Sequence, residues 1–362
     1  MKRKEITALC LVGVLLSGIA AAVASEAGSV DDPLIALSWL KAHFLPQVVS
    51  EAEKAVDARL EELAKELAAA GATGVELRVK RDDMFELESG SSLTCLAGEV
   101  SILSQSAVVD ITSGQEVSTG LAQLRHRYLA DENSMAAFTV SSDTAVIRLT
   151  GPCKATLSDA VDYNMLADGL KELGLFRGSD VPYGSGYELE AAPTRIQGLI
   201  MFLRLLGEEP QALAYPGSGV VFSDVPEWAV AYVAYAYDKG YTKGQSVNGT
   251  GEVLFGPSGI LTANDYMTFL LRALGYEEEK DFHWVSACAD ARTAGVLTAG
   301  EAKLLVEEPF LRAQVAYLSY YTLSAKVAGE GITLLDRLVS GGIVKREEAQ
   351  ALFARISQQR LA

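Results

Sequence analysis

The stretch TRIQGLIMFLRLLG (Thr194–Gly207) is matched by TANDYMTFLLRALG (Thr262–Gly275), which lies 262 − 194 = 68 residues further along the chain. A third, more divergent copy runs from Phe310 to Leu323. Each copy reads as a helix, a glycine turn, a short extended loop and a second, apolar helix. One helix pair of this size cannot bury its own apolar face, so the three copies are expected to share one core.

The segment around the second copy carries further elements in a fixed order. They are FSDVPEWA (Phe222–Ala229), a helix closed by the glycine of Tyr232–Gly240, the Phe255-Gly256-Pro257 loop and the Leu261-Thr262 start. In this order they resemble the S-layer homology domain, whose repeats carry FxDVP, a tryptophan, an FxP loop and a helix start similar to Thr-Arg-Ala-Glu. The resemblance places three repeats within residues 155–325, at about 155–210, 218–278 and 280–325.

The copies differ from one another at the start of the second helix. The first keeps Thr194-Arg195 and the third keeps Arg312-Ala313, whereas Ala263 replaces the arginine in the second. The resemblance implies a pseudo-threefold bundle whose inter-repeat grooves bind secondary cell-wall polysaccharide, which is often pyruvylated. The ketal carboxylate of such a polymer suits a guanidinium and the free N–H groups at a helix N-terminus.

The candidate polysaccharide contacts that the resemblance implies are Arg195, Thr194, Arg312, Trp228, Asp224 and Lys243. Thr194 is expected to cap its helix, which puts Arg195 in the first turn beside the N–H donors. Trp228 offers a flat face to a sugar ring, unless it packs in the core. Asp224 either contacts ligand or caps the helix after it. Lys243 is a candidate replacement for the cation that is missing at Ala263. The loss of the arginine is explained better by a second groove that no longer binds ligand.

Outside the repeats the sequence predicts a multidomain α+β chain. Residues 1–24 have a basic start, an apolar run and an Ala-Val-Ala end, which is typical of a secretory signal peptide. Residues 25–75 are predicted to be helical, and the apolar stripe from Val56 to Ala70 suits either packing on its own domain or self-association. Between 76 and 152 the apolar period changes to two, which predicts a small antiparallel β domain.

The C-terminal residues 326–362 are expected to form a helical hairpin around Gly341-Gly342. No stretch after the signal reaches 18 uninterrupted apolar residues, so no membrane span is expected in the mature chain. Cys10 leaves with the signal. Cys95 and Cys153 flank the β region and either pair or, with Cys288, stay free as small buried side chains.

The composition and motifs argue against two classes of function. The 362 residues hold 31 Lys and Arg against 47 Asp and Glu, a formal net charge of −16, which disfavours nucleic-acid binding. The three histidines lie in different segments, and no HExxH, GxSxG or nucleotide-binding glycine loop is present. We therefore expect no enzymatic activity and no cofactor.

The sequence as a whole predicts a secreted protein of the bacterial cell wall or cell surface, anchored non-covalently to wall polysaccharide by its three repeats. Two alternatives stay open. One is a secreted enzyme with an unrecognised active site in the β domain. The other is a self-assembling surface-layer subunit, for which the stripe from Val56 to Ala70 is the only indication.

Overall fold

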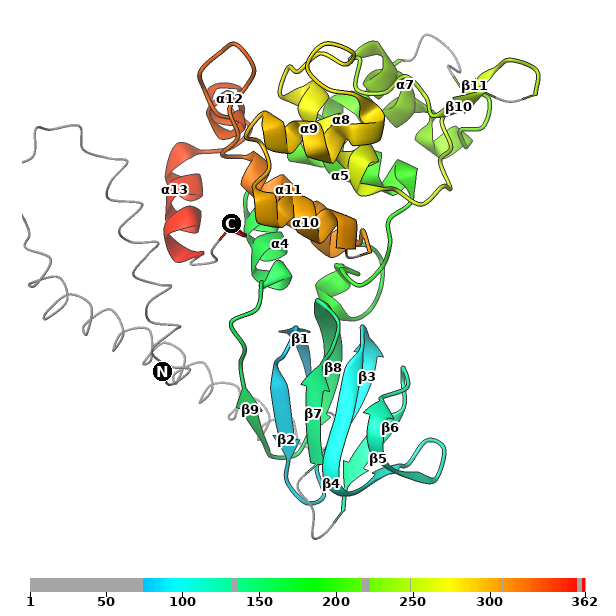
Figure 1. Ribbon diagram of the computed structural model, residues 1–362, viewed down its shortest axis with the longest axis vertical. Helices are drawn as coiled ribbons and strands as arrows, with labels where there is room; N and C mark the ends of the chain where they lie inside the picture. Colours follow the sequence, from blue (N-terminus) through cyan, green and yellow to red (C-terminus); the bar gives the residue numbers. More distant parts are fainter. Residues whose placement is uncertain are drawn as a thin grey trace, which may run out of the picture.

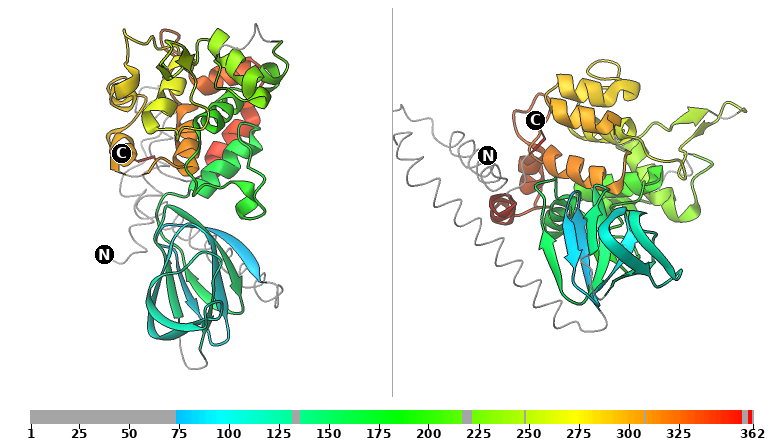
Figure 2. Two further views of the ribbon diagram at one scale, coloured as in Figure 1. Left: turned by 90° about the vertical axis from the view of Figure 1, so that its right-hand side faces the viewer. Right: turned by 60° about the horizontal axis from the view of Figure 1, so that its bottom comes forward.

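The chain forms two adjoining bodies, one a sheet and the other a set of helices (Figures 1 and 2). The computed structural model describes residues 74–131, 136–216, 222–247, 249–307, 309–356 and 360–361. The mixed α+β class is confirmed, because strands β1 to β9 precede the helices. The expected signal peptide and all but the last two residues of the predicted helical segment at 25–75, including its apolar stripe, lie outside the described residues.

The sheet body is built from short strands in which apolar and polar side chains alternate. They are β1 (Val75–Lys80), β2 (Met84–Leu87), β3 (Ser92–Ala97), β4 (Val100–Asp110), β5 (Gln115–Leu121), β6 (Arg127–Ala130), β7 (Ala136–Val140), β8 (Thr144–Thr150) and β9 (Cys153–Thr156). In β7 every second side chain is buried, as in a strand with one face on a core. The antiparallel order is β1-β8-β3-β6-β4-β7-β2-β9, with β5 beside β4.

Strand β4 curls the sheet onto itself. Its first residues pair with β7 (Val100 with Val140), and its last residues pair with β6 (Val108 with Ala130). Its register with β5 shifts after Leu103, and an irregularity of this kind increases twist and redirects a strand. The curled sheet encloses its own apolar core, in which the largest fully buried side chains are Phe85, Leu87, Leu93, Ile102, Tyr128, Phe138 and Ile147.

The helical body consists of α4 (Tyr163–Glu172), α5 (Arg195–Leu205), α6 (Glu209–Leu213), α7 (Val230–Asp238), α8 (Ala263–Ala273), α9 (Ala287–Thr293), α10 (Ala299–Glu307), α11 (Arg312–Thr322), α12 (Leu334–Ser340) and α13 (Arg346–Arg355). Short elements join them: η3 (Gly184–Gly186), η4 (Glu227–Ala229), η5 (Trp284–Ser286) and the β10 (Ser246–Val247) and β11 (Val253–Leu254) pair. One apolar core runs through this body. Every residue of α11 is buried. The elements packed around this helix therefore bury their own apolar side chains against it.

Charged hydrogen bonds join the two bodies. Arg78 of β1 donates from both terminal nitrogens to Asp168 of α4, each at 2.9 Å, and the Tyr187 hydroxyl donates to the same carboxylate at 2.6 Å. Gln314 of α11 donates to Asp143 in the turn between β7 and β8 at 2.6 Å. A bidentate Arg–carboxylate pair fixes the relative orientation of the two side chains as well as their distance. It therefore holds β1 in a defined position against α4.

Cys95, Cys153 and Cys288 are all free, and the alternative in which Cys95 pairs with Cys153 is wrong. Cys95 lies buried on β3, whereas Cys153 is half-buried on β9 at the edge of the sheet. Burial raises the pKa of both thiols to about 11, so they stay protonated near neutral pH.

Residues near the C-terminus return to the helical body. Arg360 donates from Nε and Nη2 to the two carboxylate oxygens of Glu301 at 2.7 and 2.8 Å, and also to the carbonyl of Val296. Glu301 is fully buried at the start of α10. The amide of Leu361 donates to the Tyr317 hydroxyl at 2.9 Å. Arg360 therefore compensates a carboxylate that has no access to water.

Replacing Arg360 should destabilise the protein strongly, because it leaves Glu301 charged and buried. For Arg360→Ala we expect the free energy of unfolding to fall by about 3 kcal/mol. Arg355→Ala is the matched control, since both side chains of its bridge to Glu172 are exposed and such a bridge contributes little to stability. Urea titration of both variants measures the difference, and equal losses would contradict the role given to Arg360.

Candidate functional site

The starts of helices α5, α8 and α11 are where the sequence placed the ligand contacts. The Thr194 hydroxyl accepts from the amide of Gln197, whose side chain accepts in turn from the Thr194 amide. Thr262 and Asp265 make the same reciprocal pair at α8. The capping role predicted for Thr194 is confirmed, and Thr262 has the same role. At each helix start the reciprocal pair satisfies the N-cap amide and the third amide of the helix. At α11 the N-cap position is Leu311, which has no side-chain acceptor.

The next two N–H groups of α5 bind a loop of the second repeat. The amides of Arg195 and Ile196 donate to the carbonyls of Gly259 and Pro257 at 2.8 and 3.2 Å. These acceptors lie three and five residues before Thr262, the N-cap of the next long helix (262 − 3 = 259; 262 − 5 = 257). The prediction that the start of α5 leaves donors free for an anion is therefore wrong.

Helix α11 repeats this arrangement on the first repeat. The amides of Arg312 and Ala313 donate to the carbonyls of Ala191 and Leu189 at 2.9 and 3.0 Å. The acceptors again precede a helix cap, here Thr194, by three and five residues (194 − 3 = 191; 194 − 5 = 189). Protein carbonyls thus occupy the same positions at both helix starts where a bound anion was expected.

Arg195 points its side chain into the helical body. It is 5% exposed, and its Nη1 donates to Asp265 of α8 at 2.8 Å. The guanidinium lies over the rings of Phe255 and Phe269, 5.2 and 5.4 Å from their centroids. Burial lowers the pKa of Arg195, and the charge of Asp265 opposes that shift. Because this charge is already compensated inside the protein, the prediction of an open guanidinium at Arg195 is wrong.

Arg312 is equally buried, at 4% exposed, and its Nε donates to the carbonyl of Tyr187 at 3.0 Å. No carboxylate among the described residues lies within ion-pair distance of it. Burial lowers the pKa of its guanidinium, and the charge of Glu188 opposes this without a direct bond. A side chain this buried is closed to a polymer, so the prediction of an open contact at Arg312 is also wrong.

Asp224 holds its own repeat together. Its two carboxylate oxygens accept from the amides of Phe255 and Gly256 at 2.9 and 2.7 Å, which fixes the loop before α8. The η4 turn that follows Asp224 has no side-chain cap, so the alternative of a helix cap is wrong as well. The carboxylate that was proposed to meet ligand is thus engaged within the repeat.

The two remaining candidates, Trp228 and Lys243, are exposed. Trp228 in η4 is 62% exposed, so its ring is open to solvent as a sugar platform requires. Lys243 is also exposed, but its Nζ lies 2.6 Å from Glu278, which Arg272 of α8 contacts at 2.8 Å. Lys243 therefore takes part in an ion-pair network next to the C-terminal end of α8, away from Ala263 at its start.

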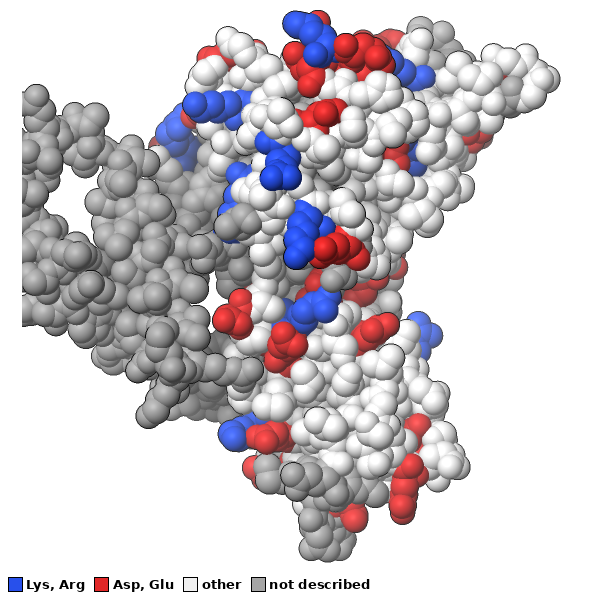
Figure 3. Space-filling view, viewed as in Figure 1, with Lys and Arg blue, Asp and Glu red and all other residues white. Residues whose placement is uncertain are grey.

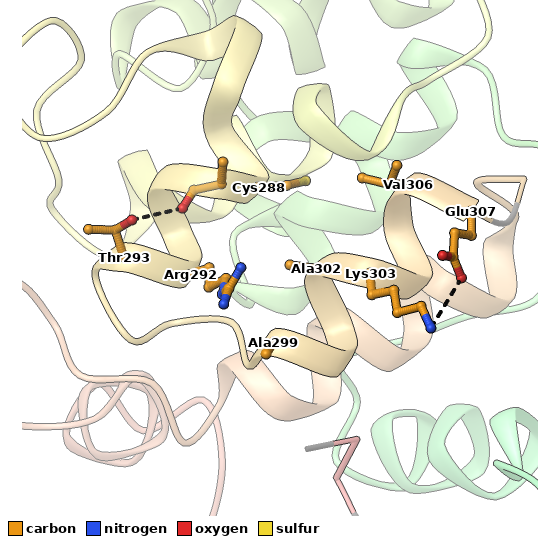
Figure 4. A pocket seen from close by; sticks show the side chains of 9 residues that line it. Cys288, Arg292, Thr293, Ala299, Ala302, Lys303, Val306 and Glu307 are labelled. Atoms are coloured by element: carbon orange, nitrogen blue, oxygen red, sulfur yellow. Dashed lines mark hydrogen bonds and ion pairs between the residues drawn. The ribbon is translucent and has the colours of Figure 1, made fainter.

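A groove of about 660 Å³ lies between α9 and α10 (Figure 4). Arg292 and Cys288 of α9 point into it, and Ala302, Lys303 and Val306 of α10 form the opposite wall. Burial raises the pKa of the Cys288 thiol to about 12, so this sulfur contributes apolar surface and no nucleophile. The groove combines an apolar floor with two cationic side chains, Arg292 and Lys303, and one carboxylate, that of Glu307.

The cations of the groove are available to a ligand. Arg292 is exposed, and no carboxylate of the described residues lies within ion-pair distance of it. Lys303 is 3.9 Å from Glu307, and both of these side chains are largely exposed. A surface pair of this geometry contributes little stability, so an incoming carboxylate can compete with Glu307 for Lys303.

The groove adjoins the start of α8, where the second copy has lost its arginine. Asn264, directly after Ala263, donates from its side chain to the carbonyl of Val285 at 2.7 Å. The same side chain accepts from the amide of Cys288 at 3.0 Å. These two bonds hold the beginning of α9, and with it one wall of the groove, against the first turn of α8.

Sequence reasoning missed Arg292, Lys303 and Trp284. Trp284 is 49% exposed and lies in η5, immediately before α9, as Trp228 lies in η4 immediately before α7. This shared position before the first helix of a copy was a signal that could have identified Trp284. The two cations carried no such signal, because they lie in the most divergent copy and come together only when α9 packs beside α10.

In the sheet body, a polar cluster surrounds the buried Asp110. Its carboxylate accepts from His126 Nδ1 at 2.8 Å, from the Ser113 hydroxyl at 2.7 Å and from the amide of Thr112 at 2.9 Å. Burial opposes ionisation, but these hydrogen bonds outweigh it and lower the pKa of Asp110 to about 2. Because Ser113 binds the aspartate and not the histidine, the cluster lacks the serine–histidine contact that nucleophilic catalysis needs.

Comparisons with known proteins give no relative. No protein-family model matches the chain, and no curated protein matches it. Among the helices of the described residues, none has both the length and the hydropathy to cross a bilayer. The same residues contain no group of three His, Cys, Asp or Glu side chains placed to hold a metal ion.

The burial of Arg195 predicts a loss of stability on its replacement. Arg195→Met leaves Asp265 without its cation, and we expect the free energy of unfolding to fall by about 3 kcal/mol. Adding Asp265→Asn should restore part of the loss, because no buried charge then remains. Arg292→Met, at an exposed position, should change stability by less than about 0.5 kcal/mol. If urea denaturation gives the Arg195→Met protein the same free energy of unfolding as the parent, the stabilising role of the buried pair is refuted.

The Asp110 cluster predicts a pH dependence. The folded pKa, about 2, lies below the ordinary value of 3.8, so the stabilisation is complete above about pH 4 and is lost as the pH falls through 2. Between pH 5 and 2 the urea midpoint of Asp110→Asn should therefore fall less steeply than that of the parent. Glu116→Gln, at an exposed position, should follow the parent. Parallel curves for Asp110→Asn and the parent would exclude this linkage.

Proposed function

We propose that this chain is a secreted protein of the bacterial cell envelope, held non-covalently on wall polysaccharide by three degenerate repeats of the S-layer homology type. The observation that carries the proposal is the groove between α9 and α10, which offers Arg292 and Lys303 to an anionic polymer. The resemblance of the repeats supplies the class of polymer. An enzymatic role has no part in this proposal.

The contacts between repeats support a pseudo-threefold arrangement. The start of α5 binds the loop before α8, and the start of α11 binds the loop before α5, at equal spacings from the following N-cap. A third contact of this kind would join the start of α8 to residues 306 and 308, before α11. The amide of Asn264 makes no such bond to the carbonyl of Val306, and residue 308 lies outside the described part of the chain. Two of the three contacts therefore support the arrangement, and closure of the ring belongs to the proposal.

The chemistry of the groove suits a sugar that bears a carboxylate. A guanidinium binds a carboxylate through two parallel hydrogen bonds, and an ammonium adds a second, more adaptable donor. Figure 3 shows basic side chains over α9 and α10, with an acidic side chain beside the one over α10. Trp284 lies just before α9, outside the lining of the groove, and its ring stacks on His283 with the centroids 6.0 Å apart. It is 49% exposed, and we propose that its open part stacks on a sugar ring. A pyruvylated polysaccharide meets all three requirements.

The two alternatives of the sequence have less support. For an enzyme in the sheet body, the polar cluster around Asp110 and His126 is a candidate, but its serine hydroxyl donates to the aspartate and makes no hydrogen bond to the histidine. For a lattice subunit, the proposed stripe from Val56 to Ala70 lies outside the described residues. We therefore place the function in the helical body.

Reversing the charge of the groove tests this proposal. Arg292→Glu with Lys303→Glu should weaken binding of the full-length mature protein to purified cell wall at least tenfold, or about 1.4 kcal/mol. The matched control is Lys154→Glu with Arg355→Glu, which reverses an exposed lysine and an exposed arginine elsewhere. The control should bind within twofold of the parent. Sedimentation of the protein with the wall, before and after the polysaccharide is removed, provides the measurement.

Two results would reject the proposal. One is equal binding to wall with and without its polysaccharide, since the polymer would then not be the ligand. The other is undiminished binding by the Arg292→Glu, Lys303→Glu protein at an unchanged melting temperature. In that case the groove between α9 and α10 would not be the site.

A further inference from the structure

The outer face of strands β8, β3 and β6 carries two arginines in one row. Thr94 of β3 pairs with Arg148 of β8 on one side and with Arg127 of β6 on the other. Residues directly opposite one another in a sheet share a face, and the chain neighbours of Thr94, Leu93 and Cys95, are buried in the core of the sheet body. Thr94 and both arginines therefore face outward. The backbones of the two arginines are about 10 Å apart, which is twice the spacing between strands.

Both arginines are open to a partner. Arg127 is exposed, its Nε donates to the Ser92 hydroxyl at 2.8 Å, and no carboxylate of the described residues lies within ion-pair distance of it. The side chain of Arg148 is 47% exposed, and its Nη2 lies 3.5 Å from Glu76. A surface pair of this kind contributes little stability. In a chain with a formal net charge of −16, this row is therefore a local site of positive charge for an anionic partner.

Apolar side chains lie beside the arginine row on the same face. Leu129 of β6 pairs with Val109 of β4, and both are half-buried. Their chain neighbours belong to the buried interior of the sheet, so these two side chains also face outward. Acidic residues stand at the two margins, where Glu76 pairs with Arg148 and Glu116 pairs with Val109. The middle of the face is thus cationic and partly apolar.

The segment that precedes β1 has a complementary composition. Residues 25–73 lie outside the described residues apart from this sequence pattern, which predicts a helix with an apolar stripe from Val56 to Ala70. Between 51 and 66 it holds six acidic and three basic residues, a net charge of 3 − 6 = −3. They are Glu51, Glu53, Asp57, Glu61, Glu62 and Glu66 against Lys54, Arg59 and Lys65.

The acidic residues of this segment flank its apolar stripe on both sides. With 3.6 residues per turn, Glu53 and Asp57 lie one turn apart on one flank of the predicted helix. Glu62 and Glu66 lie one turn apart on the other flank. A helix of this pattern presents an apolar strip bordered by carboxylates, which suits an apolar surface bordered by arginines.

The segment also ends next to the arginine row. Val75, the first residue of β1, pairs with Leu149, the neighbour of Arg148. The link from the predicted helix to β1 is GATG (residues 71–74), which has the usual length of a connection between a helix and a strand. Gly74 has a φ of 71°, and a Cβ there would lie 2.5 Å from the carbonyl oxygen of Leu149, so the chain needs glycine where it enters the sheet. A helix tethered by so short a link is expected to pack on the sheet that it precedes.

We propose that the predicted helix before β1 docks on the outer face of β8, β3 and β6 of its own chain. The inner face is already filled by the core of the sheet body. The distance between Arg127 and Arg148 matches the diameter of a helix with its side chains, about 10–12 Å. The apolar stripe then covers β3 and Leu129, and one acidic flank meets each arginine. This contact uses the stripe within one chain, and it is independent of the proposed polysaccharide groove.

Hydrogen exchange of residues 56–70 in the full-length mature protein tests the proposal. An isolated helix of this length is marginal in water, so slow exchange of its amides reports docking. The parent should protect these amides equally over about a hundredfold range of protein concentration, because the contact lies within one chain. Arg127→Glu with Arg148→Glu should speed their exchange at least tenfold. The matched control is Arg346→Glu with Arg355→Glu, which reverses two exposed arginines of α13 and should exchange within twofold of the parent.

A charge exchange provides a second measurement. Adding Glu62→Lys and Glu66→Lys to the Arg127→Glu, Arg148→Glu protein should slow the exchange of residues 56–70 again, because opposite charges face each other once more. If the double glutamate variant has a lower melting temperature than the parent, Arg127→Gln with Arg148→Gln replaces it.

Three results would overturn the proposal. Fast exchange of residues 56–70 in the parent would show that the segment is not docked. Undiminished protection in the Arg127→Glu, Arg148→Glu protein at an unchanged melting temperature would place the docking surface elsewhere. Protection that increases with protein concentration would assign the stripe to self-association between copies.

Discussion

The first turns of the long helices depend on carbonyl groups supplied by another repeat. Helices leave their first N–H groups without internal partners, and a helix start buried without acceptors is unstable. In α5 and α11 the acceptors come from the loops before α8 and α5. The first and third repeats therefore require a neighbour for backbone hydrogen bonding as well as for apolar burial. This requirement explains why Arg195 and Asp265, 265 − 195 = 70 residues apart, form one buried pair.

The same constraint bears on the proposed polysaccharide site. Helix starts whose donors already serve the neighbouring repeat have none left for an anion, and their arginines are buried with them. An open surface remains where the third copy departs from the others, because α10 lies between its two main helices and forms a groove with α9. The basic side chains there, Arg292 and Lys303, are exposed because no inter-repeat contact uses them. The degeneracy of the repeats and the position of the candidate site thus have one cause.

Much of the fold could be predicted from local sequence. The capping threonines, the alternation of the strands and the mixed α+β class follow from short-range patterns, and the repeat spacing predicted a shared core. Burial of Arg195 could not be predicted, because its partner comes from a helix that only packing brings close. Asp224 was misassigned for the same reason, since its partners are amides of a loop more than thirty residues away. The groove escaped prediction because its two cations follow no motif.

The central claim is that inter-repeat bonds close the helix starts and leave recognition to the groove between α9 and α10. Amide hydrogen exchange of the mature protein, with and without purified wall polysaccharide, tests this claim most directly. The account predicts that the amides of Arg195, Ile196, Arg312 and Ala313 exchange slowly in the free protein and do not change, while polysaccharide slows exchange in α9 and α10. Fast exchange at those four amides that becomes slow only when polysaccharide is added would contradict it.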